Sequence, residues 1–211
     1  MLRMNNPLAY ESVKKSLAAL HDCGIRMFPE STVEDVLVVL SFDDDHLTNY
    51  LPSYKDILSA ISFETNYLFH VHLTHGDDET DLPLSDSVWY LDEECIYGEG
   101  DYEKIIEAMR TLAKDNLPIE NISEKFDLEN KGVVQLKFRL QNMEYYWEMK
   151  LRHDWLDREI LTKTAQLLND QNQLLRYAIC RDSDLSGFVV CLTLEQIERL
   201  NQTTGLEFII Y

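Results

Sequence analysis

The chain is poor in the residues that break or loosen a fold. Of its 211 residues only seven are glycine and five are proline, while 45% are hydrophobic. This composition excludes a disordered chain, an extended linker and a collagen-like repeat, since none of these buries much apolar surface. A chain of this length can bury a full core, either as one larger domain or as two small ones.

Long apolar runs are also missing. The longest, VLVVL at 36–40, is much shorter than the roughly 20 residues that a membrane-spanning helix needs. The opening MLRMNNPLAYESVKK lacks the apolar core of a signal peptide. The four cysteines have no CxxC spacing, and we therefore expect reduced, mostly packed thiols in a cytoplasmic protein. They are Cys23, Cys95, Cys180 and Cys191.

Basic residues are scarce, and the excess of acidic over basic residues is concentrated in one third of the chain. There are 19 Lys and Arg against 38 Asp and Glu, and the stretch from Ser41 to Glu107 holds 17 acids and only two bases. A negative field repels nucleic acid and anionic membranes, and it attracts basic proteins and speeds their association. The same charge could serve solubility alone, and the sequence leaves that alternative open.

Hydrophobic spacing predicts helices in the first sixty residues, over about 8–23, 31–40 and 53–61. Ser31-Thr-Val-Glu34 has the capping-box pattern for the second of these helices. Alternation of apolar and polar residues over 67–74 predicts a strand, followed by the acidic loop HGDDETDLPLSD. A short extended run over 88–96 then leads into a helix over about 102–114.

The second half contains a β-hairpin whose register can be predicted. A two-residue loop at Gln141-Asn142 places apolar residues of 134–140 opposite apolar residues of 143–151, and Arg139 opposite Glu144. A helix starting near Asp154, two strands over 175–181 and 188–192, a helix after Thr193 and a last strand over 206–211 follow.

Together these elements predict an α+β protein. A helical or mixed N-terminal region precedes a ββαββαβ layer in which helices pack on one antiparallel sheet. We expect an acidic N-terminal subdomain over 1–115 and a C-terminal subdomain over 116–211, or one continuous domain.

Three histidines within YLFHVHLTHGDD, at 67–78, raise the question of a metal site. His70-Val-His72-Leu-Thr74-His75 resembles the HxHxDH zinc motif of the metallo-β-lactamase family, with Thr74 in place of the aspartate. Zinc catalysis needs about three protein ligands and an open position, and His153 is the only histidine further along the chain. A polar strand face explains the histidines without a metal, and a metal-dependent hydrolase using His70, His72 and His75 is the alternative hypothesis.

Other catalytic patterns are absent from the sequence. It has no GxSxG, P-loop, GxGxxG or protein-kinase motif. Asp43-Asp44-Asp45 and DDETD at 77–81 lack the spacing of an EF-hand loop. We therefore predict no cofactor and no enzymatic activity.

Two stretches carry a resemblance to a known class. LSDSVWYLDEECIYGEGDYEKIIEAMRTL at 84–112 and FVVCLTLEQIERLNQTTGLEF at 188–208 resemble segments of bacterial immunity proteins encoded beside polymorphic toxins. The resemblance implies a cytoplasmic, non-enzymatic protein that binds its cognate toxin domain and blocks it. It implies no specific functional residues.

The leading hypothesis is an immunity-type inhibitor of a basic toxin or nuclease domain, with no binding to nucleic acid or membrane. We expect the partner to contact an acidic surface. Its predicted members are Asp77, Asp78, Glu79, Asp81, Asp92, Glu93 and Glu94. A scaffold or regulatory domain that is acidic only for solubility is a further alternative.

Overall fold

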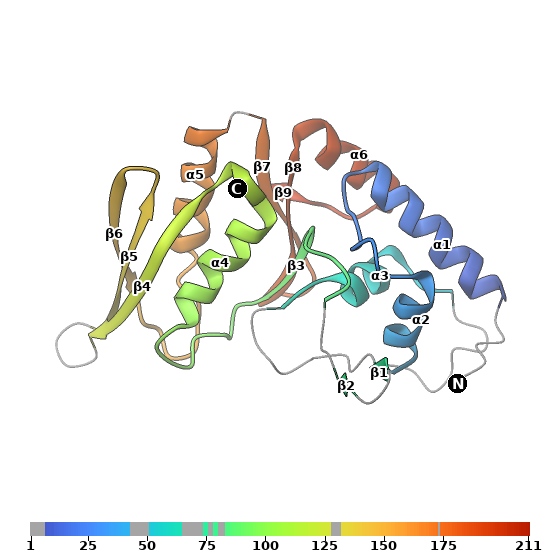
Figure 1. Cartoon of the computed structure of the whole chain (residues 1–211), viewed down its shortest axis with the longest axis horizontal. Helices are drawn as coiled ribbons and strands as arrows, with labels where there is room; N and C mark the ends of the chain where they lie inside the picture. The colour runs from blue at the N-terminus through green and yellow to red at the C-terminus, as the bar shows by residue number, and fades with distance from the viewer. Residues whose placement is uncertain are drawn as a thin grey trace.

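A four-stranded antiparallel sheet with the order β3-β8-β7-β9 lies at the centre of the structure (Figure 1). In this computed structural model the described residues are 7–42, 51–64, 74–75, 78–79, 83–127, 132–172 and 174–211. The sheet consists of β3 (Val88–Asp92), β7 (Leu175–Arg181), β8 (Ser186–Thr193) and β9 (Ile209–Ile210). Interior strand β8 is buried along almost its whole length, which explains its nearly continuous apolar sequence.

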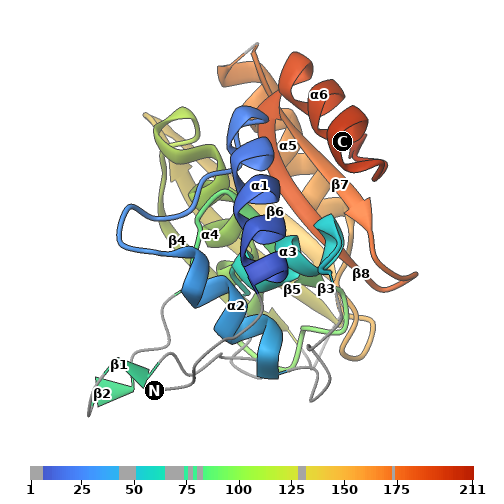
Figure 2. The same cartoon turned by 90° about the vertical axis from the view of Figure 1, so that its right-hand side faces the viewer.

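The two faces of this sheet carry two separate hydrophobic clusters. Val189 and Cys191 belong to one cluster, and Phe188 and Val190 belong to the other, because successive residues of a strand point to opposite faces. Helices α4 (Asp101–Ala113) and α5 (Glu159–Gln171) cover the first face (Figure 1). The other face is covered by α1 (Pro7–Asp22), α2 (Val33–Phe42), α3 (Tyr54–Ile61) and α6 (Leu194–Thr204) (Figure 2).

A second antiparallel sheet lies outside α4 and α5. It has the order β4-β5-β6 and consists of β4 (Ile119–Asp127), β5 (Val133–Leu140) and β6 (Met143–Lys150). A 3-10 turn over Lys114–Asn116 joins α4 to this sheet. In Figure 1 the layers therefore run from the small sheet through α4 and α5 to the central sheet and then to the remaining helices.

The predicted α+β class is confirmed, but the ββαββαβ layer on one sheet is not. The elements follow one another in the expected order, which is β5, β6, α5, β7, β8, α6 and β9. However, β5 and β6 belong to the small sheet, and β7, β8 and β9 belong to the central one. The edge strand β3 comes from the N-terminal half of the chain. Both hydrophobic clusters include residues from either side of the boundary expected at 115/116, and the division into two subdomains stays a prediction.

The predicted β5–β6 hairpin is confirmed in its register. Leu140 pairs with Met143, Phe138 with Tyr145, and Arg139 with Glu144 on the opposite face. Gln141 takes the positive φ of 56° that the tight connection requires. Apolar pairing on one face thus fixed the register although the turn lacks glycine.

Strand β4 was not predicted, and a β-bulge explains why. The register with β5 shifts between Glu120 and Ser123, and Asn121 lies there with a φ of 54°. A bulge inserts an extra residue and so breaks the alternation of period two. In addition, Glu124 takes a partly buried position where a regular pattern would place an apolar side chain.

The helix starts agree with the sequence to within a few residues. The capping box of Thr193 and Gln196 is present at α6 as predicted. For α2 the reciprocal bonds join Thr32 and Asp35, one residue later than expected. α5 begins at Glu159, because His153 and Asp154 form a turn that lets Arg152 bridge to Trp155. Among the helices of the described residues, none has both the length and the apolar character that crossing a membrane requires.

Candidate partner-binding surface

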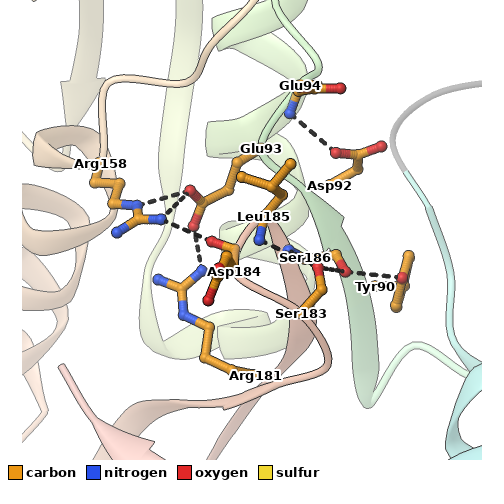
Figure 3. Close-up of polar contacts among 10 residues, drawn as sticks. All are labelled: Tyr90, Asp92, Glu93, Glu94, Arg158, Arg181, Ser183, Asp184, Leu185 and Ser186. Carbon is orange, nitrogen blue, oxygen red and sulfur yellow. Dashed lines mark hydrogen bonds and ion pairs between the residues drawn. The ribbon is translucent and has the colours of Figure 1, made fainter.

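The end of strand β3 positions three of the seven predicted contact residues. β3 pairs with β8 from Val88 opposite Val190 to Asp92 opposite Ser186. Beyond this point the chain bends at Glu93, and Asp92 is exposed, Glu93 buried and Glu94 partly exposed. In Figure 3 Glu93 turns toward two arginines, while Asp92 and Glu94 turn away from them.

Glu93 is a buried carboxylate between two guanidinium groups. Its side chain is 2% exposed, and Oε2 accepts a hydrogen bond from Nε of Arg158 at 2.7 Å and forms an ion pair with Nη2 at 2.6 Å. Its other oxygen, Oε1, accepts from Arg181 of β7 (Figure 3). A buried charge persists only when it is paired and hydrogen-bonded, and both oxygens of Glu93 meet that condition.

This cluster joins three parts of the chain that are distant in sequence. The backbone N–H of Glu93 donates to the carbonyl of Leu185 at 2.8 Å, and its carbonyl accepts from the N–H of Leu156 at 2.8 Å. Arg158 also donates to the carbonyl of Asp184 at 3.2 Å. The segment that presents Asp92 and Glu94 is therefore held to the β7–β8 turn and to the segment before α5.

Asp92 and Glu94 lie at the surface next to an exposed aromatic residue. Asp92 is exposed and Glu94 is partly exposed, and the N–H of Glu94 donates to Oδ1 of Asp92 at 2.9 Å. Tyr97 is 66% exposed, and its hydroxyl donates to the carbonyl of Glu94 at 2.5 Å. Tyrosine is enriched in protein interfaces and is among the residues that contribute most to binding energy there.

Glu64 is an acidic residue of the same surface that the sequence did not single out. Phe63, its neighbour, bridges to Trp89 of β3, with its N–H donating to Val88 and its carbonyl accepting from Tyr90. Burial, together with the charge of Asp92, raises the pKa of Glu64 to about 7. The only sequence signal was its place just after an apolar helix. We call Glu64, Asp92, Glu94 and Tyr97 the acidic face.

A second polar network supports the acidic face from the side of α3. The hydroxyl of Tyr90 lies 3.2 Å from Oδ2 of Asp182 and 3.0 Å from Oγ of Ser186 (Figure 3 shows the serine contact). Asp182 also forms an ion pair with Lys55 of α3, and this hydrogen bond raises the pKa of Lys55. The hydroxyls of Ser183 and Ser186 lie 2.8 Å apart and stabilise the turn. The network is structural in character, since its hydroxyls are all engaged.

The remaining predicted contact residues lie in the acidic stretch before β3. Asp78 and Glu79 form the short strand β2, which pairs with β1 (Thr74–His75) in the register His75 opposite Asp78. Asp77 and Asp81 lie outside the described residues. The structure therefore brings Asp92 and Glu94 together and buries Glu93 below them, and the contact role of all seven stays a prediction.

The histidine hypothesis falls mostly on residues that the structure does not describe. His70 and His72 lie outside the described residues, and His75 is described only as part of β1. Among the described residues, no group of three or more His, Cys, Asp or Glu side chains is arranged to hold a metal ion. A hollow of about 560 Å³ lies on the small sheet, where strand residues such as Lys125, Lys137 and Glu148 line it.

Comparison of the chain with family models, with curated proteins and with solved structures gives no match.

Proposed function

We propose that the protein is a cytoplasmic, non-enzymatic binding protein of immunity type. It neutralises a basic toxin or nuclease domain by binding it directly. The observation that carries the proposal is the segregation of charge: residues 41–107 hold −15 of the net charge of −19. Such a field attracts a basic protein and raises its association rate.

The acidic face gives this field a defined surface. Asp92 and Glu94 are presented from a segment that Glu93, Arg158 and Arg181 hold in place. A surface that is already ordered binds at a lower entropic cost than one that must order on contact. The acids of a toxin-blocking surface would occupy the basic cleft that otherwise binds nucleic acid phosphates.

The experiment begins with co-expression. A toxin-like protein encoded by a neighbouring open reading frame is produced with and without this chain, and growth is scored. We expect cells that produce the toxin-like protein to grow only when this chain is produced with it. Binding of the purified pair, measured from about 50 to 500 mM NaCl, should weaken steeply, because salt screens exposed charges beyond about 10 Å at 0.1 M.

Matched charge variants locate the contact. Asp92→Asn with Glu94→Gln removes two charges from the acidic face, and Glu195→Gln with Glu198→Gln removes two from α6, which follows the opposite end of β8. We expect the first pair to slow association and the second to have little effect. Salt-insensitive binding, or equal effects of the two pairs, would overturn the proposed mechanism.

A further inference from the structure

The two larger sheets have four edges, at β3, β9, β4 and β6, and three of these are short or partly covered. At β3 the backbone of Phe63 forms hydrogen bonds with the outward backbone groups of the strand. Its N–H donates to the carbonyl of Val88 at 3.1 Å, and its carbonyl accepts from the N–H of Tyr90 at 2.9 Å. β9 has only two residues. An edge that is covered or short does not offer a template for another strand.

The edge at β4 is interrupted and partly covered by a different arrangement. The bulge at Asn121 interrupts it, and the carboxylate of Glu103 on α4 accepts the N–H of Glu124 at 2.9 Å. The N–H of Glu103 donates in turn to Glu124 at 2.8 Å. Bulges and covering helices are common means of blocking an edge strand.

Strand β6 is the exception, and its free edge can be traced residue by residue. At its end the N–H of Lys150 donates to Asp157 at 2.9 Å, and its carbonyl accepts from the hydroxyl of Tyr102 at 3.4 Å. The polar backbone groups of Lys150 therefore face away from β5. Because these groups alternate along a strand, those of Glu144, Tyr146 and Glu148 face the same way.

The outward groups of Glu144, Tyr146 and Glu148 are open. Within the part of the chain that the structure describes, no hydrogen bond reaches their backbone N–H or carbonyl groups. β6 is eight residues long and pairs with β5 without a register shift, and in Figure 1 it lies at the far left of the molecule. A long, regular, unpaired edge is a site to which an extended segment can add.

The side chains along this edge indicate the chemistry of that segment. Glu144 and Glu148 lie on the outer face on either side of Tyr146, which is 67% exposed. Glu144 pairs with Lys137 of β5 at 3.1 Å and accepts the hydroxyl of Tyr146 at 2.7 Å, whereas Glu148 has no ion-pair partner among the described residues. On the other face Tyr145 and Trp147 are only partly buried and remain available at the edge. A complementary strand would carry basic residues opposite the glutamates and apolar residues opposite the aromatic pair.

We propose that the free edge of β6 binds an extended segment of a partner protein in which basic and apolar residues alternate. The proposal deepens the proposed function, on which it rests for the existence of a protein partner, and it concerns a different sheet from the acidic face. A second copy of the chain is a poorer occupant. Each copy carries a net charge of −19, and pairing centred on Tyr146 would set Glu144 against Glu148 of the other copy.

The test uses a synthetic peptide of alternating lysine and valine, about eight residues long to match the strand. A peptide of alternating glutamate and valine is the control. With the full chain, we expect the first peptide alone to slow hydrogen exchange at the amides of Glu144, Tyr146 and Glu148, as followed by NMR. Absence of protection at these amides, or equal protection by both peptides, would refute the proposal.

Two matched variants separate backbone pairing from general attraction between charges. Tyr146→Pro and Tyr146→Ala both lose the ring, but only the proline lacks the outward N–H, and proline is tolerated on an edge strand when its nitrogen faces solvent. We expect the proline variant to bind the lysine peptide about tenfold more weakly than the alanine variant. Equal affinities would exclude strand addition.

A charge reversal keeps the test decisive if the proline variant fails to fold. Glu144→Lys with Glu148→Lys should transfer the preference to the glutamate peptide, whereas Glu195→Lys with Glu198→Lys on α6 should not. An unchanged preference would overturn the assignment of a basic occupant.

Dimerisation in sedimentation, abolished by Tyr146→Pro but not by Tyr146→Ala, would make the second copy the occupant instead. If all these tests fail but salt-dependent binding through the acidic face is intact, the β6-edge proposal is wrong and the proposed function still holds.

Discussion

Arg158 and Glu93 form a two-point contact in which Nε and Nη2 of the guanidinium reach the same carboxylate oxygen, at 2.7 and 2.6 Å. Arg158 immediately precedes α5, and Glu93 follows the end of β3. The carboxylate is 2% exposed and Arg181 occupies its other oxygen, so the contact is a junction between the two halves of the chain around a buried carboxylate.

The junction predicts a specific loss of stability. Glu93→Gln leaves two guanidinium groups without a counter-charge, and we expect the free energy of unfolding to fall by about 3 kcal/mol, at the low end of the usual range because both arginines keep some solvent contact. Urea denaturation of the variant and the parent measures this difference in the free energy of unfolding. Glu94→Gln, one residue away at the surface, is the control and should stay within about 0.5 kcal/mol of the parent. Equal losses would mean that Glu93 is not a structural residue.

The raised pKa of Glu64 predicts a pH dependence. Burial and the charge of Asp92 raise the pKa of this carboxyl to about 7 in the folded protein, against 4.5 ordinarily. Its stabilising contribution is therefore fully present below about pH 4.5 and is lost as the pH rises through 7.

Glu64→Gln isolates this effect, because glutamine keeps the neutral form at every pH. The variant should have a higher urea midpoint than the parent at pH 8 and nearly the same midpoint at pH 4. The difference between variant and parent is the quantity to follow, since other carboxyls titrate in both proteins. A difference that does not change between the two pH values would contradict the assigned pKa.

The four cysteines should be unreactive in the folded protein. All four thiols are free and buried, and burial raises the pKa of Cys95 and of Cys191 to about 12. The thiolate is the reactive form, so a disulfide reagent at pH 8 should modify the protein only at the rate of unfolding. Titration in urea should then release four equivalents. Rapid modification of a thiol in the native state would show that the core around it opens readily.

Zinc analysis distinguishes the binding protein from the hydrolase. If the proposed function is right, the purified protein should hold no stoichiometric zinc, and neither a chelator nor His70→Ala should change its melting temperature. Stoichiometric zinc that is lost in His70→Ala would instead favour the metal-dependent hydrolase, since zinc requires several protein ligands.

Much of the fold could be predicted because local pattern and tertiary environment agree. The β5–β6 register follows from the facing pairs Phe138–Tyr145 and Leu136–Trp147, and the start of α6 follows from Thr193 and Gln196. The division of the strands between two sheets has no such local signal. It depends on the pairing of Val88 with Val190, which no periodicity within β3 or β8 specifies.

The candidate site was predictable only in part, for a similar reason. The acidic composition singled out Asp92, Glu93 and Glu94 alike, and sequence alone could not tell which of three consecutive acids points inward. That depends on Arg158 and Arg181, which lie more than sixty positions further along the chain. Glu64 was missed because only the bridge between Phe63 and Trp89 brings it to the same surface.

The pairing of β3 with β8 also has a consequence for the order of events during synthesis. The acidic face depends on contacts with Arg158, Arg181 and Leu185, so the ribosome must release those residues before the face can take its shape. Contacts between such distant positions form late and slow the folding of a chain. The acidic face of such a protein forms only near the end of translation, and products shortened before Arg158 would lack it.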